Sequence, residues 1–200
     1  MPLLTTPALP PGALAGHHQP DLDAGDLFLR PWRPEDRPAV LAAYADPDIR
    51  RWHCRAMTDD EARDWIDTWP RRWRQETGAG WAITDGTGVL GQISLRAVDL
   101  PEAQAEVSYW VLPAARGRRV ATHALTALTA FGFDRLGLHR IWVRHSTANL
   151  ASCRVAERAG LTAEGTHRAA ARHTDGWHDM HVHARLRTDT RPAPPPRMRR

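Results

Sequence analysis

Seven short segments with apolar residues between turn signals each predict a β-strand, and residues 27–32 show a period of two. These segments span residues 27–32, 81–85, 89–98, 105–112, 139–145, 161–168 and 177–186. A glycine-rich turn at 86–88 joins the second and third of them as a hairpin.

A longer apolar period predicts four helices between these strands, over residues 35–44, 58–74, 117–135 and 149–159. Thr58 and Glu61 have the spacing of a capping box at the start of the second helix. Trp65, Trp69 and Trp73 recur every four residues, so they share one face of that helix. We expect them in the core rather than in a ligand site.

Helices inserted among runs of strands, without strict alternation, indicate an α+β fold with a mixed sheet. The Asp46-Pro47 pair is expected to end the first helix. Both chain ends are rich in proline and poor in large apolar residues. We therefore expect a flexible extension over residues 1–25, one domain over 26–187 and a disordered basic tail over 188–200.

The charge of the chain is concentrated in this tail. The formal net charge is +4, with 27 basic and 23 acidic residues, and every basic residue is arginine. The last ten residues, RPAPPPRMRR, carry four arginines and no acid, so the remaining chain is neutral. A neutral body argues against a nucleic-acid-binding groove.

The cellular compartment is indicated by three features that the sequence lacks: a disulfide framework, a signal peptide and a membrane span. Cys54 and Cys153 are too few for a disulfide framework. The first twenty residues lack the basic start and unbroken apolar run of a signal peptide, and no segment is long and apolar enough to span a membrane. We expect a cytoplasmic protein without a membrane partner, as a monomer or homodimer.

The strand–turn–helix at 105–131 is the first candidate for chemistry. A helix N-terminus leaves about four backbone N–H groups without partners and carries roughly half a positive charge, so it favours an anion. Gly117 allows close backbone approach there, and Arg116 and Arg118 add charge suited to phosphate oxygens. An ordinary strand–helix joint with solvated arginines stays open on these grounds alone.

The segment VSYWVLPAARGRRVATHALTAL resembles the acyl-CoA motif of the GNAT N-acetyltransferase superfamily, Gln/Arg-x-x-Gly-x-Gly/Ala. Arg116 and Ala121 match the ends of this motif, whereas Arg119 replaces its usual central glycine. That replacement costs backbone freedom if the position needs a positive φ.

A second segment, NLASCRVAERAGLTAEG, supports the resemblance with Asn149, Ser152 and Gly160 at the family's spacing. The resemblance covers residues 26–187 and is greatest to the RimJ/RimL-type branch. It implies a bent mixed sheet of about seven strands with flanking helices, opening after the 105–112 strand. It also implies acetyl-CoA as co-substrate, with the pantetheine arm in the opening and the pyrophosphate on backbone N–H groups of 117–122.

The residues that the resemblance places against acetyl-CoA lie in two groups. They are Trp110, Val111, Leu112, Arg116, Gly117, Arg118, Arg119, Val120, Ala121 and Thr122, followed by Asn149 and Ser152. A backbone N–H between Trp110 and Leu112 is the expected donor to the thioester carbonyl.

Two side chains are candidates for proton transfer. An attacking α-amine has a pKa near 8 and must lose a proton, and Glu106, which shares a strand face with Ser108 and Trp110, is the candidate base. Its alternative role is that of a solvated strand carboxylate. Many relatives protonate the leaving thiolate with a Tyr seven residues after the Asn, where this chain has Ala156, so Ser152 is the candidate acid. The alternative for Ser152 is a helix-start cap.

The fold implied by the resemblance nominates Trp52, His53 and Arg55 as acceptor contacts, with His53 as an alternative base. The implied reaction is direct acetyl transfer to a primary amine, either a protein N-terminus or a small molecule. A non-catalytic acyl-CoA sensor remains the alternative. His181 and His183 alternate in a strand, so a zinc pair is geometrically possible, but no acidic or Cys partner except Asp179 has a supporting spacing, and no functional metal is expected.

Overall fold

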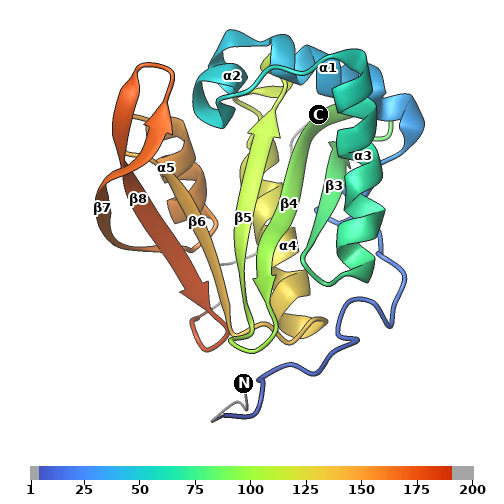
Figure 1. Cartoon of the computed structure of the whole chain (residues 1–200), viewed down its shortest axis with the longest axis vertical. Coiled ribbons are helices and arrows are strands. Elements are labelled where there is room, and N and C mark those ends of the chain that lie inside the picture. The colour runs from blue at the N-terminus through green and yellow to red at the C-terminus, as the bar shows by residue number, and fades with distance from the viewer. Residues whose placement is uncertain (1–4, 191–200) are drawn as a thin grey trace.

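Eight strands form one sheet in the computed structural model of the protein, which describes residues 5–190. Their order across the sheet is β1-β2-β3-β4-β5-β6-β8-β7 (Figure 1). The strands are β1 Leu22–Asp23, β2 Phe28–Pro31, β3 Gly78–Thr84, β4 Val89–Asp99, β5 Gln104–Val111, β6 Arg140–Ser146, β7 Thr162–His173 and β8 Gly176–Leu186. Only β5 and β6 are parallel neighbours, and the other pairs are antiparallel. The predicted mixed sheet is confirmed, with one strand more than the seven expected.

Helices cover both faces of the sheet. They are α1 Arg37–Ala45, α2 Pro47–His53, α3 Asp59–Arg74, α4 Val120–Asp134 and α5 Leu150–Arg158, with short 3-10 turns at Pro34–Asp36 and Pro113–Ala115. Helix α4 lies behind β4 and β5 in the view of Figure 1, while α3 packs against β3 on the other face. The four predicted helices are all present, with boundaries shifted by a few residues.

Helix α2 is the element that the sequence analysis missed. Pro47 was taken as the end of the preceding helix, but it occupies the first turn of a new one, where its missing N–H costs nothing. Asp46 adopts an extended conformation as the N-cap, and its carboxylate accepts a hydrogen bond from Ile49 N at 2.9 Å. The same Asp-Pro pair therefore ends α1 and begins α2.

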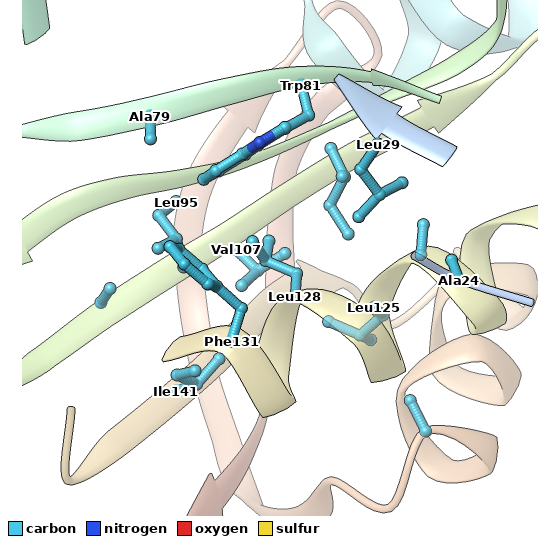
Figure 2. Close-up of a cluster of buried hydrophobic side chains, with 14 of the residues drawn as sticks. Ala24, Leu29, Ala79, Trp81, Leu95, Val107, Leu125, Leu128, Phe131 and Ile141 are labelled. Atoms are coloured by element: carbon cyan, nitrogen blue, oxygen red, sulfur yellow. The ribbon is translucent and has the colours of Figure 1, made fainter. Parts of the chain in front are cut away.

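The main core lies between α4 and the sheet. Figure 2 shows side chains from the strands, among them Trp81, Leu95 and Val107, meeting Leu128 and Phe131 of α4. Complete burial of such a side chain stabilises the fold by roughly 1.5–3 kcal/mol. This core fixes the position of α4 and therefore of the turn that precedes it.

A second apolar cluster fills the space between α1–α3 and the opposite face of the sheet. The predicted capping box of α3 is present, and Trp69 and Trp73 are buried as expected, while Trp65 is partly buried and packs edge-on against Trp69 with ring centroids 5.3 Å apart. Gly80 lies under the Trp69 ring, and a Cβ there would stand 2.3 Å from the nearest ring carbon. The absence of a side chain at Gly80 is thus what lets α3 approach β3.

The described part of the N-terminal extension packs against the domain, where the sequence predicted a mobile segment. Leu14 is fully buried, and the Glu76 carboxylate accepts hydrogen bonds from the N–H groups of Gly12 and Leu14, each at 2.8 Å. The indole N–H of Trp81 donates to Pro20 O at 2.8 Å. The burial of Leu14 and these hydrogen bonds offset the loss of conformational entropy that ordering this segment costs.

The predicted basic tail falls mostly on residues 191–200, which lie outside the described residues. Within residues 5–190, no helix combines the length and apolar character required to cross a bilayer.

Candidate functional site

The sheet opens between β5 and β6. Their pairing ends at Val107 and Val143, while β5 continues to Val111 beside β4. Leu112 N donates to Leu90 O of β4 at 2.9 Å, and backbone groups alternate sides along a strand. The N–H groups of Tyr109 and Val111 therefore face the opening, whereas those of Trp110 and Leu112 face β4. Among the expected carbonyl donors, Val111 is the one with suitable direction.

The N-terminus of α4 lies beside this opening. Gly117 has φ +75° and Arg119, the residue before the helix, has φ +58° and ψ +17°. No side chain within residues 5–190 caps α4, and its first turn contains no acidic residue. The N–H groups of Val120, Ala121 and Thr122 precede the first i–4 bond of the helix, from His123 N to Arg119 O. These uncapped donors and the helix dipole form a site suited to an anion.

The two arginines of the turn have carboxylate partners, which the sequence did not predict. Arg116 contacts Asp46 at 2.5 Å and Asp48 at 2.8 Å, and its Nε donates to Val111 O at 3.3 Å. Arg118 lies 3.6 Å from Asp85. Arg116 thus ties the start of α2 to the end of β5. Its three nitrogens already have partners within the described residues, so it contributes to the anion site chiefly by fixing the turn.

Two cavities border the opening and meet there. A cavity of about 390 Å³ extends along the end of β5, the start of α4 and helix α5. A second, of about 820 Å³, extends toward α2, α3 and the β7–β8 hairpin. Five residues line both of them: Trp52, His53, Tyr109, Asn149 and Ser152. A ligand in each cavity would therefore meet the other at these five residues.

The first turn of α5 brings Ser152 to this junction. Asn149 is the N-cap, and its side-chain oxygen accepts a hydrogen bond from Ser152 N at 3.1 Å. The Ser152 hydroxyl lies 2.7 Å from the Tyr109 hydroxyl, which also donates to Ser152 O at 3.2 Å. Burial raises the pKa of Tyr109 above its ordinary value, so this phenol stays protonated. The junction holds two coupled hydroxyl groups, both able to donate a proton.

Sequence reasoning did not identify Tyr109 as a functional residue. Strict alternation places it on the core face, opposite Glu106 and Ser108. The Tyr109 ring does pack against the main core, and because β6 separates from β5 beyond Val107, its hydroxyl also reaches Ser152 of helix α5. Ala156, which replaces the usual family tyrosine, is fully buried in the core.

Glu106 lines the larger cavity and is 6% exposed. Its carboxylate accepts a hydrogen bond from Arg96 Nη2 at 3.0 Å. Ser108 lines the same cavity. Glu106 is a fixed, buried carboxylate rather than the solvated one considered as its alternative.

Trp52, His53 and Arg55 all line the larger cavity, and their role as acceptor contacts stays a prediction. The Nε2 atom of His53 lies 3.2 Å from Tyr109 O. Because a carbonyl only accepts, Nε2 must carry a proton. Burial lowers the pKa of His53 to about 4, so the ring is neutral at physiological pH and a weak base. This argues against His53 as the general base.

The known proteins that this chain resembles are acetyltransferases, which agrees with the geometry of the site. The family model for the acetyltransferase (GNAT) domain matches residues 26–162. The uncharacterized N-acetyltransferase YoaA of Bacillus subtilis is 26% identical over 150 residues, which are 73% of this chain and 85% of YoaA. From the same organism, the "Putative ribosomal N-acetyltransferase YdaF" is 27% identical over 169 residues, 82% of this chain and 92% of YdaF.

A solved structure of RimL, a ribosomal L7/L12 alpha-N-protein acetyltransferase in complex with coenzyme A, superimposes with a TM-score of 0.74 at 22% identity. The match covers 80% of this chain and 93% of that one, which shows a shared fold.

Proposed function

Since the chain belongs to the GNAT family of acetyl-CoA-dependent N-acetyltransferases, we propose that its acceptor is the α-amine of a peptide or protein N-terminus. The observation that carries this proposal is the meeting of the two cavities at Tyr109, Asn149 and Ser152. One cavity ends in an anion site, as a nucleotide-bearing acyl donor requires. The other has the volume for an extended acceptor.

The residues of the smaller cavity fit acetyl-CoA. The uncapped start of α4 offers the N–H groups of Val120, Ala121 and Thr122 to the pyrophosphate. The Tyr109 N–H, which faces the opening, is available to an amide carbonyl of the pantetheine arm. Asn149 and Ser152 line the far wall.

Acetyl-CoA supplies an acetyl group activated as a thioester. Val111 N–H is positioned to donate to the thioester carbonyl oxygen and so to stabilise the charge that develops there. Glu106 is positioned to receive, through water, the proton that the attacking amine loses. The Ser152 hydroxyl, supported by Tyr109, is positioned to return a proton to the departing thiolate. The amine nitrogen thereby gains the acetyl group, and the donor leaves as free CoA.

The charge around the larger cavity favours an acidic peptide. Five guanidinium groups line it against three carboxylates: Arg55, Arg72, Arg96, Arg144 and Arg172, with Glu61, Asp64 and Glu106. Its volume of about 820 Å³ lies near the upper end of the range usual for small-molecule sites, roughly 300–1,000 Å³. Complementary charge would direct the second and third residues of an acidic N-terminal segment toward the arginines.

The test is the release of CoA thiol from acetyl-CoA with matched acceptors. One set contains short peptides with a free α-amine followed by acidic, neutral or basic residues. The same peptides with a blocked N-terminus and a free lysine are the controls, and a third set contains small amines. We expect turnover with the free α-amine, with kcat/KM highest for the acidic peptides and very low for Glu106→Gln.

Each other outcome has a distinct meaning. Turnover confined to small amines would replace the proposed acceptor class while leaving the catalytic assignment intact. Turnover with blocked peptides would indicate lysine side chains as acceptors. No release of CoA in any set, with acetyl-CoA still raising the Tm, would favour the acyl-CoA sensor over the proposed reaction.

A further inference from the structure

Three histidines and one cysteine gather on one face of the β6–β8 pair, beneath helix α5. His145 of β6 is paired in register with His181 of β8, and His183 lies two residues further along the same face. Cys153 of α5 covers this group from above. One possible ligand atom from each of the four side chains lies within 4.8 Å of the others.

The cluster is buried or half-buried and has unsatisfied nitrogen atoms. His145 is 6% exposed and His183 is fully buried. Among residues 5–190, neither His145 Nε2 nor His181 Nδ1 has a hydrogen-bond partner. A buried polar atom without a partner is destabilising, so several of them around one point call for a common ligand.

The orientation of the His145 ring is that of a metal ligand. His145 Nδ1 lies 2.8 Å from Ser146 O, and since a carbonyl only accepts, the proton is on Nδ1 and the Nε2 lone pair is free. This backbone contact is the outer-shell arrangement usual for a metal-bound histidine. His183 directs Nε2 at Cys153 Sγ, 3.7 Å away.

The spacing agrees with a tetrahedral site. With Zn–S near 2.3 Å and Zn–N near 2.05 Å, tetrahedral geometry places S and N about 3.6 Å apart and two N atoms about 3.35 Å apart. The Cys153–His183 separation of 3.7 Å already meets the first value. The widest separation, 4.8 Å, needs about 1.4 Å of closure, which side-chain rotation can supply.

We propose that His145, Cys153, His181 and His183 together bind one Zn²⁺ ion. A ligand set of one thiolate and three imidazoles suits zinc, and four protein ligands form the closed shell of a structural site. On binding, a Zn–S bond replaces the S–H bond of Cys153, and the thiol proton passes to solvent. His181 and His183 are neighbours in the sequence pattern, whereas His145 and Cys153 join them only through the fold.

The proposed ion has a clear structural consequence. Cys153 follows Ser152 directly and lies in the first turn of α5. A metal that joins Cys153 to β6 and β8 would therefore hold the start of α5 at a fixed distance from the sheet. His145 also lines the acceptor cavity, so the ion would stiffen one of its walls. The zinc proposal does not depend on the acceptor proposed above.

The test uses the full chain without an affinity tag, purified with a reductant that does not bind metals. Bound metal is first measured in the protein as isolated, and the protein is then stripped with a chelator and titrated with Co²⁺. We expect one Co²⁺ per chain, with the intense visible bands of a tetrahedral site and a near-ultraviolet thiolate band. Zn²⁺ should displace it, and one equivalent of Zn²⁺ should raise the Tm.

Variants identify the ligands. Cys153→Ala should abolish the thiolate band and weaken Co²⁺ binding by more than the roughly 10–100-fold typical of losing an outer-shell partner. Cys54→Ala is the matched control, because Cys54 is exposed and is not one of the four clustered residues, and it should bind as the wild type does. His181→Asn provides a second ligand variant if the alanine variant folds poorly, and His167→Ala, at an exposed histidine, is its control.

Two results would overturn the proposal. One is the absence of stoichiometric Zn²⁺ or Co²⁺ binding to the folded wild-type chain. The other is an unchanged Co²⁺ spectrum in both Cys153→Ala and His181→Asn, which would place any bound metal elsewhere.

Discussion

Arg119 occupies a backbone conformation that glycine adopts more easily. Its φ of +58° and ψ of +17° lie in the left-handed region, at the position where GNAT relatives usually carry glycine. This conformation costs an L-residue roughly 1–2 kcal/mol. Glycine avoids that cost but loses more backbone entropy on folding, roughly 0.5–1 kcal/mol. The net gain for Arg119→Gly should be on the order of 0.5–1 kcal/mol.

Comparing Arg119→Gly with Arg119→Ala isolates the free-energy cost of the backbone conformation at this position. Both remove the same exposed guanidinium, and only the glycine relieves the backbone. For a chain of this length, 1 kcal/mol shifts the Tm by roughly 2–4 °C, so the glycine variant should melt about 1–4 °C above the alanine variant. Arg119→Asn should lie between them, since asparagine tolerates this region better than alanine.

Reversible guanidinium unfolding, followed by circular dichroism, gives the free-energy difference directly. Equal stability of the glycine and alanine variants would refute the strain argument. Acetyl-CoA affinity, measured in parallel, separates the side chain from the backbone. If the N–H groups of the turn hold the pyrophosphate, the two variants should bind acetyl-CoA equally.

Three further predictions concern the hydroxyl pair, the packing of α3 and the pH dependence of stability. Tyr109→Phe and Ser152→Ala should each lower kcat with little change in the Kd of acetyl-CoA. The fold loss of kcat in the double variant should be smaller than the product of the two single losses, because both side chains act on one proton path. Full additivity would separate their roles. Gly80→Ala should destabilise the fold by about 1–3 kcal/mol or more through overpacking against the indole ring, whereas Gly88→Ala, with open space around its Cβ, should not. Equal unfolding curves for these two variants would contradict that packing. The pKa of His53 falls from 6.5 in the unfolded chain to about 4 in the folded one, so the unfolded state binds more protons between these values. The contribution of His53 to the free energy of unfolding, at most about 3 kcal/mol, is therefore present above pH 6.5 and lost as the pH falls toward 4. His53→Gln should flatten this slope in pH-dependent unfolding, and an unaltered slope would assign it to other groups.

Patterns local in sequence predicted most of the elements correctly. The capping box at Thr58, the alternation through Glu106 and the helix after the Arg116 turn each depend on residues within a few positions of one another. The Asp46-Pro47 pair was misinterpreted because the same two residues can end one helix and begin another. Only the identity of Asp46 as an N-cap, visible in the structure, decides between them.

Contacts between distant segments could not be predicted from these patterns. The N-terminal segment docks because it forms hydrogen bonds with Glu76 and Trp81, more than fifty residues away in the sequence. Tyr109 keeps to the core face of β5, but its hydroxyl reaches Ser152 of α5 because β6 departs there, and no local pattern marks that point. The partners of Arg116, at Asp46 and Asp48, likewise become neighbours only through the fold.

The structural and functional interpretations of Asn149 and Ser152 are compatible at the junction. As a cap, Asn149 accepts from Ser152 N and fixes the first turn of α5, a contribution of about 1 kcal/mol. The same bond fixes the direction of the Ser152 side chain, whose hydroxyl meets Tyr109 at 2.7 Å between the two cavities. A helix that began one residue earlier or later would turn this hydroxyl by about 100° and break that contact. The cap is thus the means by which the chain positions its candidate acid, so the preference of Asn and Ser for helix starts supports their placement in the site.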